Sequence, residues 1–223
     1  RLIRAIPRTL PFGLTSPWWT IVMGIQHDRL HLETSPVLIR QHALEHVTPH
    51  PAWEPCRKSG RAPQNQLINV DKDTVYLGKS RNDPIYGWDN EYGSHVAEVP
   101  AFQAGQYLVS NQEFLPFVEA NGYGTEHFWE EEGRAWQRHT RVQHPTFWIE
   151  RGTEWRLRLM TEEVPMPWNW PVEVNYHEAQ AFCNWKTATS GQPLRLPTAD
   201  EWTRPYALAR FSAIRPPSTA AAI

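Results

Sequence analysis

The chain has 223 residues and a formal net charge of −2, with acidic and basic side chains mixed along its length. This balance excludes the strongly basic surface by which proteins bind nucleic acid or anionic membranes, and we expect neither partner. The two cysteines are too few for a disulfide framework, which favours a reducing, cytoplasmic location. We expect no signal peptide and no membrane-spanning segment, because no apolar run reaches the required length.

Tryptophan and proline are the unusual part of the composition, with 12 and 20 residues respectively. Proline removes a backbone donor and favours irregular, loop-rich structure. Tryptophan supplies large rigid side chains that can pin such loops in a core or line a pocket. We favour the core interpretation, because aromatic side chains dominate core burial in general. A pocket with aromatic walls is the alternative.

The first predicted element is a helix that begins at Pro17. Ser16 is suited to cap it, and proline suits the first helical position. Apolar residues recur at helical spacing and lie near one face, namely Trp18, Ile21, Val22, Ile25 and Leu32. Pro36 cannot donate a backbone hydrogen bond, so we expect the helix to kink or end near it.

Two histidines stand four residues apart in this helix, His27 and His31. They project from one face, one turn apart, and this spacing allows both imidazoles to reach one metal ion. Glu33 points about 160° away from His31, so it is a candidate to orient a neighbouring group rather than to bind the same ion. Nonheme iron usually takes three protein ligands, so a third must come from elsewhere. A histidine pair that binds no metal is the alternative.

Residues 47–65 are rich in proline and polar side chains and read as a linker. Beyond it, residues 67–78 and 95–110 predict short strands joined by turns. Residues 144–174 are expected to be mostly loop with one or two short strands. Residues 206–223 are rich in alanine and proline and are expected to form a poorly ordered tail.

Three later helices are predicted by capping residues that each precede a glutamate by three positions, which is the capping-box pattern. The capping residues are Ser110, Asn175 and Thr198, and the glutamates are Glu113, Glu178 and Glu201. Gly191 is a candidate stop for the second of these helices. Cys183 lies within that helix and is interpreted as a packing residue, because a buried cysteine usually behaves as a small hydrophobe. Arg195 is interpreted as a structural ion-pair partner, and residues 89–91 as a capped turn rather than a cation site.

The stretch HDRLHLETSPVLIRQ, which begins at His27, resembles the HxxxHxE motif of the sulfoxide synthases of thiol-histidine biosynthesis, and most of all their ovothiol branch. The resemblance continues through LEHVTPHPAWEPC, YGWDNEYGSHVAEVPAFQAGQYLVSNQEFLPFVEANGY, PVEVNYHEAQAFCNW and RLPTADEW. The last two stretches also resemble the broader formylglycine-generating and sulfatase-modifying family. The resemblance covers roughly residues 18–204.

The resemblance implies an α+β fold in which a helical bundle precedes a loop-rich domain. Residues 1–46 would be the C-terminal part of a DinB-like, iron-binding helical domain, followed by the linker over 47–65. Residues 66–205 would be part of a C-type-lectin-like, sulfatase-modifying-factor domain, and 206–223 a divergent tail.

The resemblance also implies the chemistry. Fe(II) would be held by three histidines, of which His27 and His31 are two, with Glu33 as a hydrogen-bonding neighbour of the site. The substrates would be cysteine, histidine and O2, and sulfur would be joined to C5 of histidine and oxidised. The third histidine and a tyrosine that donates a proton or an electron would lie outside this chain, so we assign no catalytic residue. We therefore expect a fragment, truncated at both ends, that is inactive by itself and whose oligomeric state is open.

Leu30 bears on the branch of the family. Ergothioneine-pathway enzymes can carry a glutamine just before the second histidine, where it contacts the imidazole substrate, whereas leucine cannot make that hydrogen bond. This position favours the ovothiol branch, with Leu30 beside the imidazole substrate. The ergothioneine branch is one alternative, and a non-catalytic lectin-like binding module is another, because fold does not fix function.

Overall fold

The computed structural model describes residue 13 and residues 15–211, with side chains as far as residue 205. Its first helix, α2 (Pro17–Arg40), has Pro17 in its first turn and is capped by Ser16, whose side chain accepts a hydrogen bond from the backbone N of Trp18. This start confirms the prediction. The helix continues through Pro36 and ends one turn later, at Arg40, so the end expected near the proline falls four residues beyond it. The carbonyl that Pro36 leaves without a partner belongs to the exposed Leu32, where water can hydrate it.

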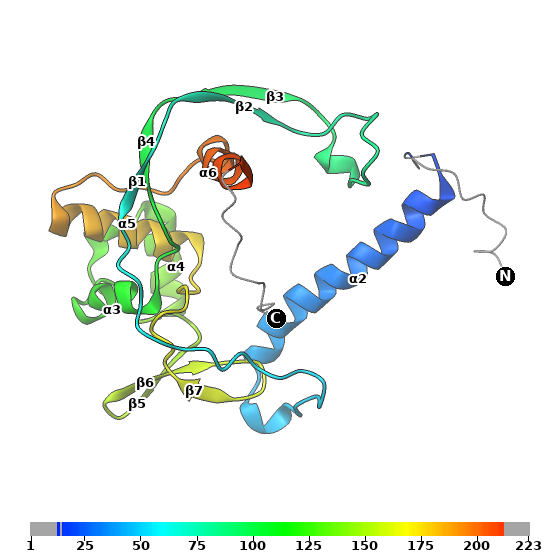
Figure 1. Ribbon diagram of the computed structural model, residues 1–223. Helices are drawn as coiled ribbons and strands as arrows, with labels where there is room; N and C mark the ends of the chain where they lie inside the picture. The colour runs from blue at the N-terminus through cyan, green and yellow to red at the C-terminus, as the bar shows by residue number, and fades with distance from the viewer. Residues whose placement is uncertain (1–12, 14, 212–223) are drawn as a thin grey trace.

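Helix α2 projects from the rest of the molecule, and none of its residues is buried (Figure 1). Its C-terminal end is anchored by Arg40. The guanidinium of Arg40 donates to Glu173 at 2.6 Å and to the carbonyl of Arg158 at 2.9 Å, and it stacks 3.5 Å from the ring centre of Phe147. Toward the middle of α2 the predicted apolar face stays open to solvent, and Ile25 and Leu32 are about half exposed.

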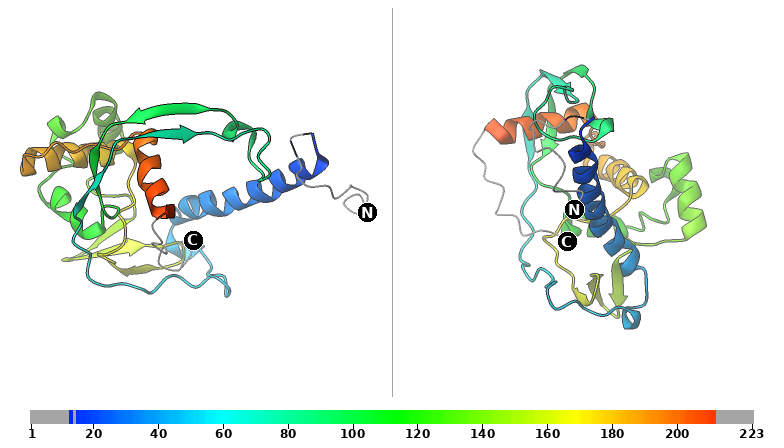
Figure 2. Two further views of the ribbon diagram at one scale, coloured as in Figure 1. Left: turned by 45° about the horizontal axis from the view of Figure 1, so that its top comes forward. Right: turned by 90° about the vertical axis from the view of Figure 1, so that its right-hand side faces the viewer.

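A long two-stranded hairpin, here called the arm, arches away from the body (Figures 1 and 2). Its strands are β1 (Leu67–Val70), β2 (Asp73–Leu77), β3 (His95–Val99) and β4 (Phe102–Gly105). β1 pairs with β4 and β2 pairs with β3, both antiparallel, so the two ladders follow one another along the same hairpin. The predicted strands are confirmed. Gly78, directly after β2, has φ +97°, and a Cβ there would lie 2.5 Å from the carbonyl oxygen of Gly93. Only glycine suits this close approach of two backbone segments.

The body packs helices against a small antiparallel sheet. The helices are α3 (Asn111–Glu119), α4 (Glu131–Thr140) and α5 (Tyr176–Ser190), and the sheet order is β5 (Trp148–Arg151), β6 (Glu154–Arg158), β7 (Glu163–Pro165). Most of residues 144–174 is loop, as predicted, but the segment holds three strands rather than the one or two expected, and α4 was not predicted. Aromatic rings fill the core between these elements, and Phe114, Phe117 and Trp148 are almost completely buried. Most of the tryptophans of the body belong to this core or pack on it, which favours the core interpretation of the composition.

The predicted caps at Ser110, Asn175 and Thr198 begin α3, α5 and α6 (Ala199–Phe211). At Ser110 the predicted box is only half formed, because the Glu113 carboxylate accepts from Asn65 instead of from the backbone of Ser110. Asn175 and Glu178 form a complete capping box, and Glu178 also accepts a hydrogen bond of 2.6 Å from the hydroxyl of Tyr123. Burial raises the pKa of the Glu178 carboxyl. Gly191 ends α5 with φ +71°, as predicted. Helix α6 continues to residue 211, so the first six residues of the predicted tail are helical, and residues 212–223 lie outside the described part of the chain.

Helix α6 supports the arm. Arg204 pairs with Asp73 at 3.0 Å, and its guanidinium also donates to the carbonyl of Asp71. His95 lies 3.1 Å from Asp200. Within the described residues, no helix has both the length and the apolar character that crossing a bilayer requires.

The Arg195–Glu201 pair confirms the structural role predicted for Arg195 and gives a pH-dependent contribution to stability. Arg195 donates twice to the Glu201 carboxylate, at 2.5 and 2.7 Å, and lowers the pKa of Glu201 from 4.5 to about 2. A pKa that is lower in the folded state stabilises the fold above pH 4.5, and this contribution is lost as the pH falls toward 2. We expect Glu201→Gln to flatten the decrease in unfolding free energy over this range, measured by urea denaturation. An unchanged pH profile in the variant would contradict this role.

Candidate metal site

The predicted histidine pair lies on the exposed middle of α2. The ring centres of His27 and His31 are 4.7 Å apart and the rings are tilted by 49°, so both imidazoles project from one face as their spacing predicted. Both residues are exposed. Neither imidazole hydrogen-bonds to another described residue, so the ring nitrogens are free to bind a ligand.

This donor set suits a transition metal in its chemistry, but it is incomplete. Neutral imidazole is a common ligand of iron, zinc and copper, and two adjacent imidazoles can share one ion. Among the residues that the structure describes, no group of three His, Cys, Asp or Glu side chains is arranged to hold a metal. The described part of the chain therefore offers two of the three histidines that the iron hypothesis requires, and the metal role stays a prediction.

The two other predicted site residues lie on different stripes of α2. Glu33 is exposed and has no hydrogen-bond partner among the described residues, so its role as a neighbour of the site stays a prediction. Leu30 is 45% exposed and lies one residue before His31, which is about 100° around the helix. Leu30 shares a stripe with Gln26, four residues earlier, and this stripe adjoins that of the histidines.

The loop of the arm reaches the N-terminal half of α2, a contact that the sequence did not predict. The indole N–H of Trp19 donates to the carbonyl of Gly87 at 3.0 Å, and the indole N–H of Trp88 donates to Oε1 of Gln26 at 2.6 Å. The rings of Trp19 and Tyr86 lie 5.7 Å apart. Residues 89–91 form the predicted capped turn, in which the Glu91 carboxylate accepts from the backbone N of Trp88 at 2.8 Å.

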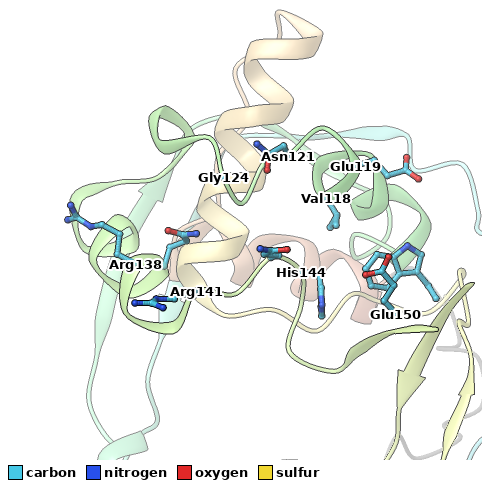
Figure 3. A pocket seen from close by; sticks show the side chains of 11 residues that line it. Val118, Glu119, Asn121, Gly124, Arg138, Arg141, His144 and Glu150 are labelled. Carbon is cyan, nitrogen blue, oxygen red and sulfur yellow. The ribbon is translucent and has the colours of Figure 1, made fainter. Parts of the chain in front are cut away.

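Two cavities lie in the body and neither includes the histidine pair. The larger, of about 640 Å³, lies between α3, α4 and the segment that leads to β5, and its lining includes Asn121, Arg141 and His144 (Figure 3). The smaller, of about 420 Å³, lies at the C-terminal end of α2 beside Arg40 and Arg158. Burial lowers the pKa of Arg158, whose guanidinium is held by the carbonyls of Leu159, Met160 and His42. Each cavity has at most one large aromatic side chain in its wall, so neither is the aromatic-walled pocket considered from the composition.

Residues 55–210 match the family described as the sulfatase-modifying factor enzyme 1-like domain. The chain belongs to this family. The matched residues include the arm, the body and most of α6, so the sulfatase-modifying-factor domain that the resemblance implied is confirmed. Helix α2 precedes the match, and the proposed DinB-like bundle is not tested by it.

The curated relatives of this sulfatase-modifying-factor protein are named hercynine oxygenase. The relative from Mycolicibacterium thermoresistibile is 31% identical over 183 residues, which are 82% of this chain and 39% of that protein. The relative from Mycolicibacterium smegmatis is 30% identical over 193 residues, which are 84% of this chain and 42% of that protein. A third, from Mycobacterium tuberculosis, is 35% identical over 131 residues. The chain thus spans about two fifths of the length of the first two relatives.

These relatives bear on the two branches considered from the sequence. Their name agrees with the ergothioneine alternative rather than with the ovothiol branch that Leu30 favoured.

Proposed function

We propose that the protein is an iron(II)- and oxygen-dependent sulfoxide synthase of the ergothioneine type, which joins a thiol to the imidazole of trimethylated histidine. The observation that carries the proposal is the pair of accessible imidazoles of His27 and His31, 4.7 Å apart, in a chain related to hercynine oxygenases. The names of these relatives also favour an enzyme over a non-catalytic binding module.

The reaction balances with O2 as the only oxidant. A C–S bond replaces the thiol S–H and the imidazole C–H bonds, one oxygen atom becomes the sulfoxide oxygen, and the other leaves as water. Bound Fe(II) supplies Lewis acidity and the redox chemistry of O2. The part of His27 and His31 is to hold the ion through their ring nitrogens, which make no hydrogen bonds to other described residues. Their exposed face leaves room for a further protein ligand and for substrates.

The ovothiol branch, with cysteine and histidine as substrates, is the second candidate, and Leu30 is the observation that favours it. A leucine next to His31 offers no hydrogen bond to an imidazole substrate, and its side chain is exposed on the stripe beside the histidines. The absence of one such bond changes the relative affinity of two substrate poses by roughly tenfold at most. The position can bias the branch without fixing it.

Competition between histidine and trimethylated histidine tests the branch. In the protein expressed from its complete gene, supplied with Fe(II), O2 and a thiol, we expect mass spectrometry to show the sulfoxide of trimethylated histidine as the main product. We expect Leu30→Gln to raise this preference by up to roughly tenfold, because the amide adds a hydrogen bond near the imidazole.

Leu32→Gln is the matched control. Leu32 is similarly exposed, at 51%, but points about 200° around the helix from Leu30, so the same substitution there should leave the preference unchanged. A parent protein that prefers histidine would support the ovothiol branch instead. Equal effects of the two substitutions would remove the role assigned to Leu30.

A further inference from the structure

The contact between the arm and α2 is built from reciprocal hydrogen bonds. Trp19 on the helix donates its indole N–H to Gly87 on the arm, and Trp88 on the arm donates its indole N–H to Gln26 on the helix. The ring of Tyr86 lies against that of Trp19. The side chains of Trp19 and Gln26 on the helix and of Tyr86 and Trp88 on the arm are all partly buried, although α2 has no fully buried residue.

The end of the arm is itself held in shape. The ammonium group of Lys79 donates to the carbonyl of Tyr86 at 2.7 Å, and Glu91 accepts from the backbone N of Trp88. Gly87 is buried, and a Cβ there would lie 2.9 Å from the side chain of Lys79. The arm therefore presents a preformed surface to α2.

The contact is placed next to the histidine pair along the helix. Trp19 and Gln26 are seven residues apart, so they lie on one stripe, two turns from each other. His27 follows Gln26 directly and is about 100° around the helix. The arm thus holds the turn that carries His27 and leaves the face of the two imidazoles open.

The helicity of that turn depends on the ends of α2. Most of the stability of a helix in a protein comes from tertiary packing of its apolar face, and α2 buries no side chain fully, so it gains little from packing. Arg40 anchors one end, and the contact with the arm anchors the other. Two histidines four apart share an ion only while the turn between them is helical, so their apparent affinity scales with the helical population.

We propose that Trp19, Gln26 and Trp88 form a clasp through which the arm positions the histidine pair for metal binding. The proposal rests on the metal role proposed for His27 and His31. These three are positioning residues: they do not touch the ion, and they keep the two imidazoles on one face. By linkage, metal binding strengthens the contact of the arm with α2 to the same extent that the contact strengthens metal binding.

Zn²⁺ titration of this chain tests the clasp, with a His27→Ala/His31→Ala variant to define the part of the binding that belongs to the pair. Trp88→Phe keeps an aromatic ring but removes the N–H. We expect it to lower the Zn²⁺ affinity that depends on the histidine pair by about threefold to tenfold, which is the effect of one lost hydrogen bond between partly buried groups. Gln26→Leu should have the same effect. Gln26→Glu, which keeps an acceptor oxygen, should restore binding.

Tyr86→Phe is the matched control at the same contact. The Tyr86 hydroxyl is buried and has no hydrogen-bond partner among the described residues, so its removal should leave Zn²⁺ affinity unchanged. A second readout is amide hydrogen exchange at residues 84–90, which Zn²⁺ should slow in the parent and leave unchanged in the double histidine variant. Such long-range protection is not expected if the tryptophans only support the fold.

The two proposals fail in different ways. If the double histidine variant binds Zn²⁺ as tightly as the parent, the metal role of the pair is wrong. If the pair binds Zn²⁺ but Trp88→Phe and Gln26→Leu bind it equally well, the clasp is wrong and the metal role stands.

Discussion

Replacing both His27 and His31 with alanine is expected to reduce the Fe(II) affinity of the protein expressed from its complete gene by at least about a hundredfold. Loss of a residue that merely orients a ligand costs about tenfold to a hundredfold in metal affinity, and here two proposed ligands are removed together. Stability should change little, because both side chains are exposed and make no hydrogen bonds to described residues. Anaerobic Fe(II) titration and urea denaturation measure the two quantities.

His42 and His46 provide a control with the same spacing. They are also four residues apart, but α2 ends at Arg40 and His46 lies in a separate short 3-10 helix (Leu44–His46), so the two are not on one helical face. Their double alanine variant should bind Fe(II) like the parent. Retention of Fe(II) affinity after loss of His27 and His31, or an equal loss after loss of His42 and His46, would contradict the assignment.

Trp148→Ala is expected to be among the most destabilising single substitutions, at about 3–5 kcal/mol, because it removes a large, almost completely buried side chain from the core. The indole meets three other rings, those of Phe114, Trp155 and Trp168, at near edge-to-face angles. No side chain next to it can fill such a space without rearrangement. Urea denaturation of the parent and the variant measures the difference.

Trp148→Phe separates packing from hydrogen bonding at the same site. The indole N–H of Trp148 is buried without a hydrogen-bond partner among the described residues, so phenylalanine gives up no hydrogen bond and keeps one ring. We expect it to cost clearly less than alanine. A small effect of Trp148→Ala, below about 1 kcal/mol, would show that this tryptophan does not support the core.

Local signals made part of this structure predictable from the sequence. The caps at Asn175 and Thr198 act within three residues, and both were found as predicted. His27 and His31 project from one face because they are four residues apart in a helix, and this follows from helix geometry alone. Such features depend only on neighbours in the chain, which the sequence shows directly.

Non-local or weakly marked features escaped prediction. Helix α4 begins at Glu131. Its N-cap residue Glu130 makes no capping hydrogen bond through its side chain, and the helix buries only Gly133, so neither a cap nor an apolar stripe marked it. The strands β5–β7 are short and lie among prolines. The hydrogen bond between Trp88 and Gln26 joins residues 62 positions apart, and no local pattern in either segment indicates the other as its partner. The metal role and the branch of the family also stay predictions. The metal role depends on a third ligand that two histidines do not specify, and the branch depends on substrate contacts that one leucine does not specify.

The anchoring of α2 also sets the order in which the protein folds. Its contacts at Arg40 lie 118 and 133 residues away in the chain, and those at the arm lie 62 and 68 residues away. At ribosomal speeds of about 5–20 residues per second, the helix waits roughly 6–24 s after its own synthesis before residue 158 exists to receive Arg40. Closing loops of that length comes after the local helices and hairpins have formed. The C-terminal anchor of α2 therefore forms later than its contact with the arm, and the side chains of Ile25 and Leu32, which stay about half exposed in the folded chain, are open to chaperones throughout.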